Sequence, residues 1–107
     1  MIVKAGQRAY LTVHLYDRKG QLDAPLSLHY HVLCLTTGVA VRGWTQHPPA
    51  SVVELELLAQ DTRMVGGNER EDRLVTVVAN YGDDNQVVDE YSFTVQRLRN
   101  PPPAVMP

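Results

Sequence analysis

The chain has 107 residues and a formal net charge of −2. This length corresponds to one domain, and a composition of 44% hydrophobic and 21% charged residues is typical of a folded globular domain. The lack of a basic surplus argues against a nucleic-acid partner. No run approaches the ~20 apolar residues of a membrane span, and no secretory signal is visible, so we expect no membrane partner.

Alternation of apolar and polar residues runs through most of the chain and predicts β-strands. The expected strands cover residues 10–16, 26–35, 39–45, 51–58, 73–81 and 89–98, with a short one at 2–4. Residues 26–35 and 39–45 should form one hairpin, and 73–81 and 89–98 another. Residues 60–64 could form one helical turn within a long connection, 59–72, that suits a crossing between two sheets. The sequence therefore predicts two packed antiparallel sheets.

The phase of each strand predicts which side chains face the core. The expected inward residues are Leu26, Leu28, Tyr30, Val32, Cys34, Val53, Leu55, Leu57, Val75, Val77, Ala79, Tyr81, Tyr91, Phe93 and Val95. Trp44 is also expected near the core, whereas the inward face of residues 10–16 stays open. The lone Cys34 should be a small buried hydrophobe, which fits a reducing cytosol. The mixed-charge run 69–73 is interpreted as a solvated loop end.

Few residues suggest chemistry. Glu54 and Glu56 alternate with apolar residues, as expected for side chains on the solvent-exposed face of a sheet. His29 and His31 share one face of a strand, where both imidazoles could meet one metal ion. No Cys, Asp or Glu lies at a recognisable ligand spacing, so we interpret them as solvent-facing. We expect no enzyme activity, no metal and no cofactor.

Two features favour binding to another chain. Apolar residues recur at positions expected on the outside of the sheets: Leu33, Leu35, Val52, Leu58, Leu74 and Val78. A monomeric sandwich would carry polar residues there, so we predict that part of this surface, including Leu33 and Leu35, contacts a partner.

The second feature is the tail, residues 100–107. Its three consecutive prolines, Pro101, Pro102 and Pro103, cannot pair inside a sheet and favour an extended arm outside the fold. Val105 and Met106 would serve as apolar anchors on a partner. The alternative is a disordered end.

Several short motifs together resemble a known group of proteins. They are LHYHV at 28–32, TG at 37–38, RGWT at 42–45, PASV at 49–52, EDRLVTV at 71–77, ANY at 79–81 and YSFTV at 91–95. Over most of residues 26–98 this pattern resembles the small immunoglobulin-like proteins of tailed bacteriophages. The resemblance implies an immunoglobulin-like antiparallel β-sandwich of about seven strands over residues 1–99, followed by the arm at 100–107.

The same resemblance implies a virion structural protein made in the host cytoplasm. The first expectation is a capsid decoration or accessory protein that binds other virion subunits in an oligomeric assembly. A head–tail connector or tail-associated protein stays open, as does a free-standing protein- or carbohydrate-binding module. The carbohydrate-binding alternative would present an exposed Trp or Tyr platform, which the expected burial of Trp44 argues against. No catalytic residues carry over.

Overall fold

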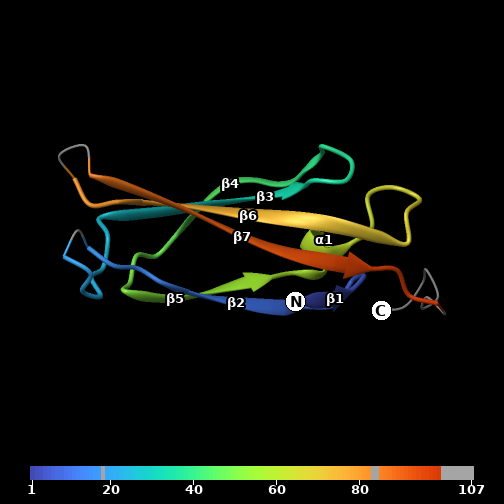
Figure 1. Ribbon diagram of the computed structural model, residues 1–107, viewed down its shortest axis with the longest axis horizontal. Helices are drawn as coiled ribbons and strands as arrows, with labels where there is room; N and C mark the ends of the chain where they lie inside the picture. Colours follow the sequence, from blue (N-terminus) through green and yellow to red (C-terminus); the bar gives the residue numbers. More distant parts are fainter. Residues whose placement is uncertain (18, 83–84, 100–107) are drawn as a thin grey trace.

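The computed structural model describes residues 1–17, 19–82 and 85–99. Within these residues the chain forms seven strands and one short helix (Figure 1). They are β1 (Ile2–Lys4), β2 (Ala9–His14), β3 (Ser27–Cys34), β4 (Ala40–His47), β5 (Val52–Leu57), α1 (Ala59–Thr62), β6 (Arg70–Asn80) and β7 (Gln86–Gln96). The all-β class and the single helical turn are confirmed. The predicted arm, residues 100–107, lies outside the described residues.

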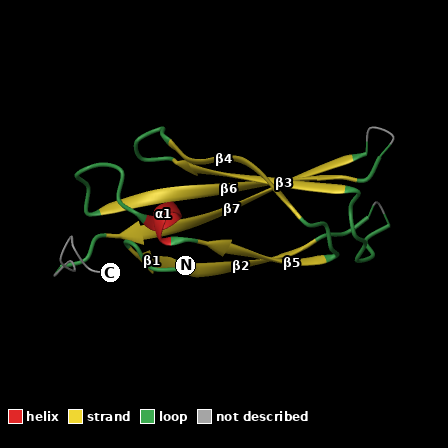
Figure 2. Cartoon of the chain, turned by 180° about the vertical axis from the view of Figure 1, so that it is seen from behind, coloured by secondary structure: helices red, strands yellow, loops and turns green. Residues whose placement is uncertain are grey.

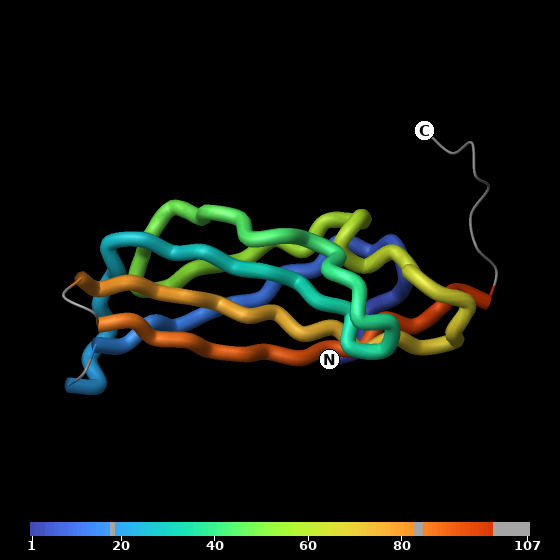
Figure 3. The backbone as a smooth tube through the Cα atoms, turned by 90° about the horizontal axis from the view of Figure 1, so that it is seen from above, coloured from blue at the N-terminus to red at the C-terminus, as the bar shows by residue number. Residues whose placement is uncertain are grey.

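The strands form two sheets that lie one over the other (Figures 1 and 2). The larger sheet has the order β1-β7-β6-β3-β4, and the smaller one pairs β2 with β5. Both hairpins predicted from the sequence are present, as β3–β4 and β6–β7. The strands of both sheets run along the long axis of the molecule (Figure 3).

One strand pair departs from the expected antiparallel arrangement. β1 runs parallel to β7, with Ile2 opposite Thr94 and Lys4 opposite Gln96. After β1 the chain crosses directly to β2 in the other sheet, and no tight turn joins β1 to β7. The antiparallel direction that a hairpin imposes therefore does not apply to this pair.

Alternating side chains of both sheets meet in the core. The inward residues predicted for β3, β5 and the middle of β6 are all buried, as are Phe93 and Val95 of β7. Tyr81 and Tyr91 are half-buried beside this core. Leu26 is an error of the prediction: it is 73% exposed, because β3 begins only at Ser27. The sequence left undecided which side chains of β2 face the core. Val13 is buried and Tyr10 is exposed, so the face that carries Val13 points inward.

Trp44 is the second error, since 59% of it is exposed. The pairing of β3 with β4 changes register between Tyr30 and Val32. Thr45 lies opposite Tyr30, but Arg42, three residues earlier, lies opposite Val32. An extra residue in β4 therefore changes the phase of its side chains, as in a β-bulge. Trp44 consequently lies on the outer face of the larger sheet.

The mixed-charge run at the start of β6 is the third error. The side chains of Glu71 and Arg73 expose no surface, and Nη1 of Arg73 lies 3.0 Å from Oε1 of Glu71. The strand begins at Arg70, earlier than expected, so its alternation carries both residues inward. A fully buried ion pair, and not a solvated loop end, therefore occupies this end of the sandwich.

The backbone of the β5–β6 connection supplies the remaining partners of this ion pair. Glu71 accepts hydrogen bonds from the amides of Val65 (2.9 Å) and Gly66 (2.6 Å). Arg73 donates to the carbonyl oxygen of Arg63 (2.6 Å) and to Sγ of Cys34 (3.1 Å). Cys34 is buried, as predicted. The two charges thus hold residues 63–66 against β3 and β6.

Asp61 of α1 forms a second buried contact in the same region. Its carboxylate accepts hydrogen bonds from Nε (2.8 Å) and Nη2 (3.1 Å) of Arg42, and from the amide of Leu58 (2.8 Å). The neighbouring Thr62 donates its hydroxyl to the carbonyl of Gln7 at 2.8 Å. Through these bonds α1 connects β4 of the larger sheet to the segment that leads into β2.

Replacing Glu71 by glutamine should destabilise the protein strongly. The change leaves Arg73 as a buried charge without its counter-ion, which typically costs about 3–5 kcal/mol. Glu69→Gln is the matched control, because Glu69 is exposed two positions earlier and its replacement should change stability by less than about 0.5 kcal/mol. Urea unfolding measures both. Equal stability of the two variants would contradict the structural role of the pair.

The same carboxylate predicts a pH dependence of stability. Burial acts to raise the pKa of Glu71, but the hydrogen bonds from Val65 and Gly66 and the contact with Arg73 outweigh it and lower that pKa. The stabilisation is complete above the ordinary glutamate value of about 4.3 and is lost as the pH falls through the lower folded-state pKa. Urea midpoints measured from pH 6 downward should fall below about pH 4.3 more steeply in the wild type than in Glu71→Gln.

Candidate interaction surface

The outer face of the larger sheet is the best candidate for a functional surface. Its side chains come from the positions of β3, β4, β6 and β7 that alternate with the core residues. The smaller sheet packs on the opposite face, and within the described residues no element covers the outer one (Figures 1 and 2).

Apolar side chains form two groups on this face, with His31, Thr76 and Glu90 between them. Leu33 of β3 lies opposite Leu74 of β6, and Val78 of β6 lies opposite Val88 of β7. The face continues to Ile2 of β1, Leu35 just beyond β3, and Trp44 of β4. Four of these side chains are largely exposed: Ile2 (59%), Trp44 (59%), Val88 (54%) and Leu35 (49%). Burying such residues is favourable by roughly 25 cal/mol per Å².

Trp44 is held in place by a neighbouring imidazole. The ring centroids of His31 and Trp44 lie 5.2 Å apart, with a tilt of 38° between the planes. Beside them His29, Trp44, Val78 and Gln86 line a shallow hollow of about 300 Å³. The arrangement offers one broad aromatic surface with imidazole and amide groups at its border.

The outer face contains two of the residues that the sequence predicted to bind a partner. Leu33 and Leu35 both belong to it, with Leu33 half-buried and Leu35 exposed. The other predicted partner-binding residues, Pro101, Pro102, Pro103, Val105 and Met106, lie outside the described residues. The alternation of β3 predicted Leu33 and Leu35. No sequence signal predicted Trp44, because a bulge in β4 reverses its phase.

His29 and His31 lie on the outer face as expected. Among the described residues, no group of three His, Cys, Asp or Glu side chains gathers as a metal site would require. Glu54 and Glu56, the other candidates for chemistry, are exposed on the outside of the smaller sheet. In the part of the chain that the structure describes, no helix is long and apolar enough to cross a membrane.

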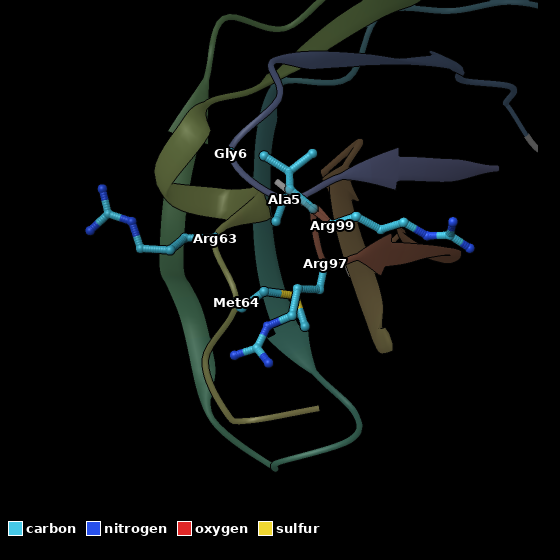
Figure 4. Close-up of a pocket in the computed structure, with 7 residues that line it drawn as sticks. Ala5, Gly6, Arg63, Met64, Arg97 and Arg99 are labelled. Carbon is cyan, nitrogen blue, oxygen red and sulfur yellow. The ribbon is translucent and has the colours of Figure 1, made fainter. Parts of the chain in front are cut away.

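A larger hollow of about 520 Å³ lies at the end of the molecule near β1 and β7. It is lined by Ala5, Gly6, Arg63, Met64, Arg97, Leu98 and Arg99. Three arginines suggest an anion site, but Figure 4 shows the side chains of Arg63 and Arg99 pointing in opposite directions. Because their guanidinium groups do not converge, the hollow does not form a site for one anion.

No family model, curated protein or solved structure matches the chain. The outer face is therefore interpreted from its own geometry.

Trp44→Ala should leave the fold nearly unchanged. The indole is exposed and contributes little to the core, so we expect less than about 1 kcal/mol of destabilisation. Phe93→Ala is the comparison, because Phe93 is only 4% exposed and its loss should cost about 3–5 kcal/mol. Thermal or urea unfolding gives both values. A large loss of stability in Trp44→Ala would place the indole in the core.

Proposed function

We propose that this chain is a non-enzymatic, immunoglobulin-like module that binds other structural subunits of a tailed bacteriophage virion. In this proposal it is made in the host cytoplasm and incorporated into the particle as a capsid decoration or accessory protein. A head–tail connector or another tail-associated role would use the same binding chemistry.

The strand order supports the immunoglobulin-like part of the proposal. In such sandwiches strands B and E are neighbours in one sheet, and C, F and G are neighbours in the other. Here β2 pairs with β5, and β3, β6 and β7 are adjacent in the larger sheet. These strands correspond to B, E, C, F and G, with β4 beside C. The inter-sheet disulfide of antibody domains has no counterpart, because Cys34 is the only cysteine.

The observation that carries the binding role is the uncovered outer face. Trp44, Val88 and Leu35 expose about half of their surface or more on a rigid sheet. Two apolar groups, separated by the polar row of His31, Thr76 and Glu90, are the parts of this face that favour an interaction site. Aromatic anchors such as Trp contribute disproportionately to the stability of interfaces. The virion as the location of the partner is supported by the resemblance of residues 26–98 to the phage proteins.

Incorporation into particles tests the proposal. A tagged copy produced during infection should co-purify with virions and be detected there by mass spectrometry. Trp44→Ala and Leu35→Ser should each reduce incorporation several-fold in direct competition with the wild type, because both remove exposed anchors. Val52→Ser is the control, since Val52 is exposed on the opposite sheet. Absence of the wild-type protein from purified virions would contradict the virion role.

Carbohydrate binding is a second candidate, which the exposure of Trp44 now favours. A flat aromatic ring beside His29 and Gln86 can stack on the apolar face of a sugar while the polar groups bond its hydroxyls. Binding to immobilised glycans that Trp44→Ala abolishes, together with no incorporation into virions, would support this candidate over the first.

A further inference from the structure

One edge of the larger sheet is largely unpaired. β1 covers only the end of β7, where Ile2, Val3 and Lys4 lie opposite Thr94, Val95 and Gln96. Over residues 86–93, β7 pairs with β6 on one side. Within the described residues, no strand pairs with its other side.

The backbone groups on that side can be assigned. The amide of Thr94 donates to the carbonyl of Met1 (3.0 Å), so Thr94 directs its backbone polar groups away from β6. The register of β6 with β7 is continuous from Gln96 to Gln86. Since the direction alternates along a strand, Gln86, Val88, Glu90 and Ser92 present their N–H and C=O groups at the open edge.

β7 lacks most of the features that protect such an edge. Natural edge strands are protected by short length, bulges, proline or charged side chains, and of these β7 has only the charges of Asp89 and Glu90. β7 is 11 residues long, keeps one register and contains no proline. At the opposite edge, β4 has shifted pairing and is followed closely by Pro48 and Pro49. Of the two edges of the larger sheet, the β7 edge is therefore the one suited to accept a further strand.

The charge beside this edge selects the incoming strand. Asp89 and Glu90 are exposed in the middle of the open segment. In the sequence, residues 83–90 contain four acidic residues and no basic one. Opposite charges on paired strands stabilise the pairing, whereas like charges directly opposite destabilise it. A strand that carries Lys or Arg therefore fits this edge.

The charge also disfavours a second copy of the same chain. When the β7 edges of two copies pair antiparallel, the two-fold axis between them passes through one residue of the open segment, which then lies opposite its own copy. A ladder centred on Asp89, which uses all four edge positions, places Asp89 against its own copy. A ladder centred on Glu90 does the same for Glu90. A ladder centred on Val88 avoids opposed charges but pairs only three of the four edge positions.

We propose that the open edge of β7 binds an extended, basic segment of a partner polypeptide as an added strand. Backbone bonds to Val88, Glu90 and Ser92 supply affinity, and pairing of Lys or Arg with Asp89 and Glu90 supplies selectivity. The proposal goes beyond the outer face, because it uses the backbone of an edge. Its test uses different variants, so either proposal can fail without the other.

The probe is a fluorescent peptide of about eight residues with two adjacent lysines among valines, so that one lysine lies on each face of the sheet with Asp89 and Glu90. A peptide with glutamates in place of the lysines is its control. Fluorescence anisotropy should detect binding of the basic peptide alone. Asp89→Lys with Glu90→Lys should weaken it about tenfold or more. The matched control is Glu54→Lys with Glu56→Lys, which changes the net charge equally on the other sheet and should leave the affinity unchanged.

A backbone variant separates strand addition from simple charge attraction. Val88→Pro removes an N–H that faces the edge and leaves the bonds to β6 intact, so the protein should fold while binding falls about tenfold or more. Val88→Thr keeps the N–H and should bind as the wild type. Amide exchange at Val88, Glu90 and Ser92 should slow when peptide is added.

Three results would overturn the proposal. They are no binding of the basic peptide at millimolar concentration, equal binding by Val88→Pro, or protection of amides elsewhere in place of these three. Dimerisation of the wild type in sedimentation experiments that Val88→Pro abolishes would instead identify a second copy as the occupant.

Discussion

The buried pair of Glu71 and Arg73 determines how the two sheets are joined at one end. A buried charge is tolerated only when its partners are all in place, and a half-satisfied network is worse than an apolar core. Among the described residues, no buried side-chain nitrogen or oxygen lacks a hydrogen-bond partner. Glu71 needs the amides of residues 65 and 66, and Arg73 needs the carbonyl of Arg63. The burial of both charges therefore depends on the connection between β5 and β6, which places these backbone groups beside them.

Period-two alternation predicted most of this fold. The seven strands, two hairpins and the core residues of β3, β5 and β6 follow from local spacing, because a strand with one buried face must alternate. The spacing alone does not predict which strands are neighbours within each sheet. The parallel direction of β1 depends on where the chain goes after Lys4, and the sequence carries no local signal for that crossing.

Two of the three errors share a physical cause, since the charged run and Trp44 both lie where a local rule meets a tertiary contact. A run of alternating charges is typical of a solvent-exposed segment, yet Glu71 and Arg73 neutralise each other and bond to the backbone of the connection that precedes β6. Trp44 has a regular strand phase in the sequence, but the bulge opposite Tyr30 and Val32 turns Arg42 inward to Asp61. The ion pair of Arg42 and the exposure of Trp44 are thus two consequences of one register change. A key part of the candidate surface could not be predicted without the pairing of β3 with β4.

The larger sheet carries both candidate surfaces. In a two-layer sandwich each sheet has one face in the core and one outside, and the outer face of the larger sheet has apolar residues that no part of the described chain covers. The short β1 leaves most of the edge of β7 open. The face offers side chains and the edge offers backbone groups, so they select partners by different chemistry. The two surfaces point in different directions from one sheet, so under the two proposals together a single copy would contact two neighbours at once, as a subunit inside an assembly does.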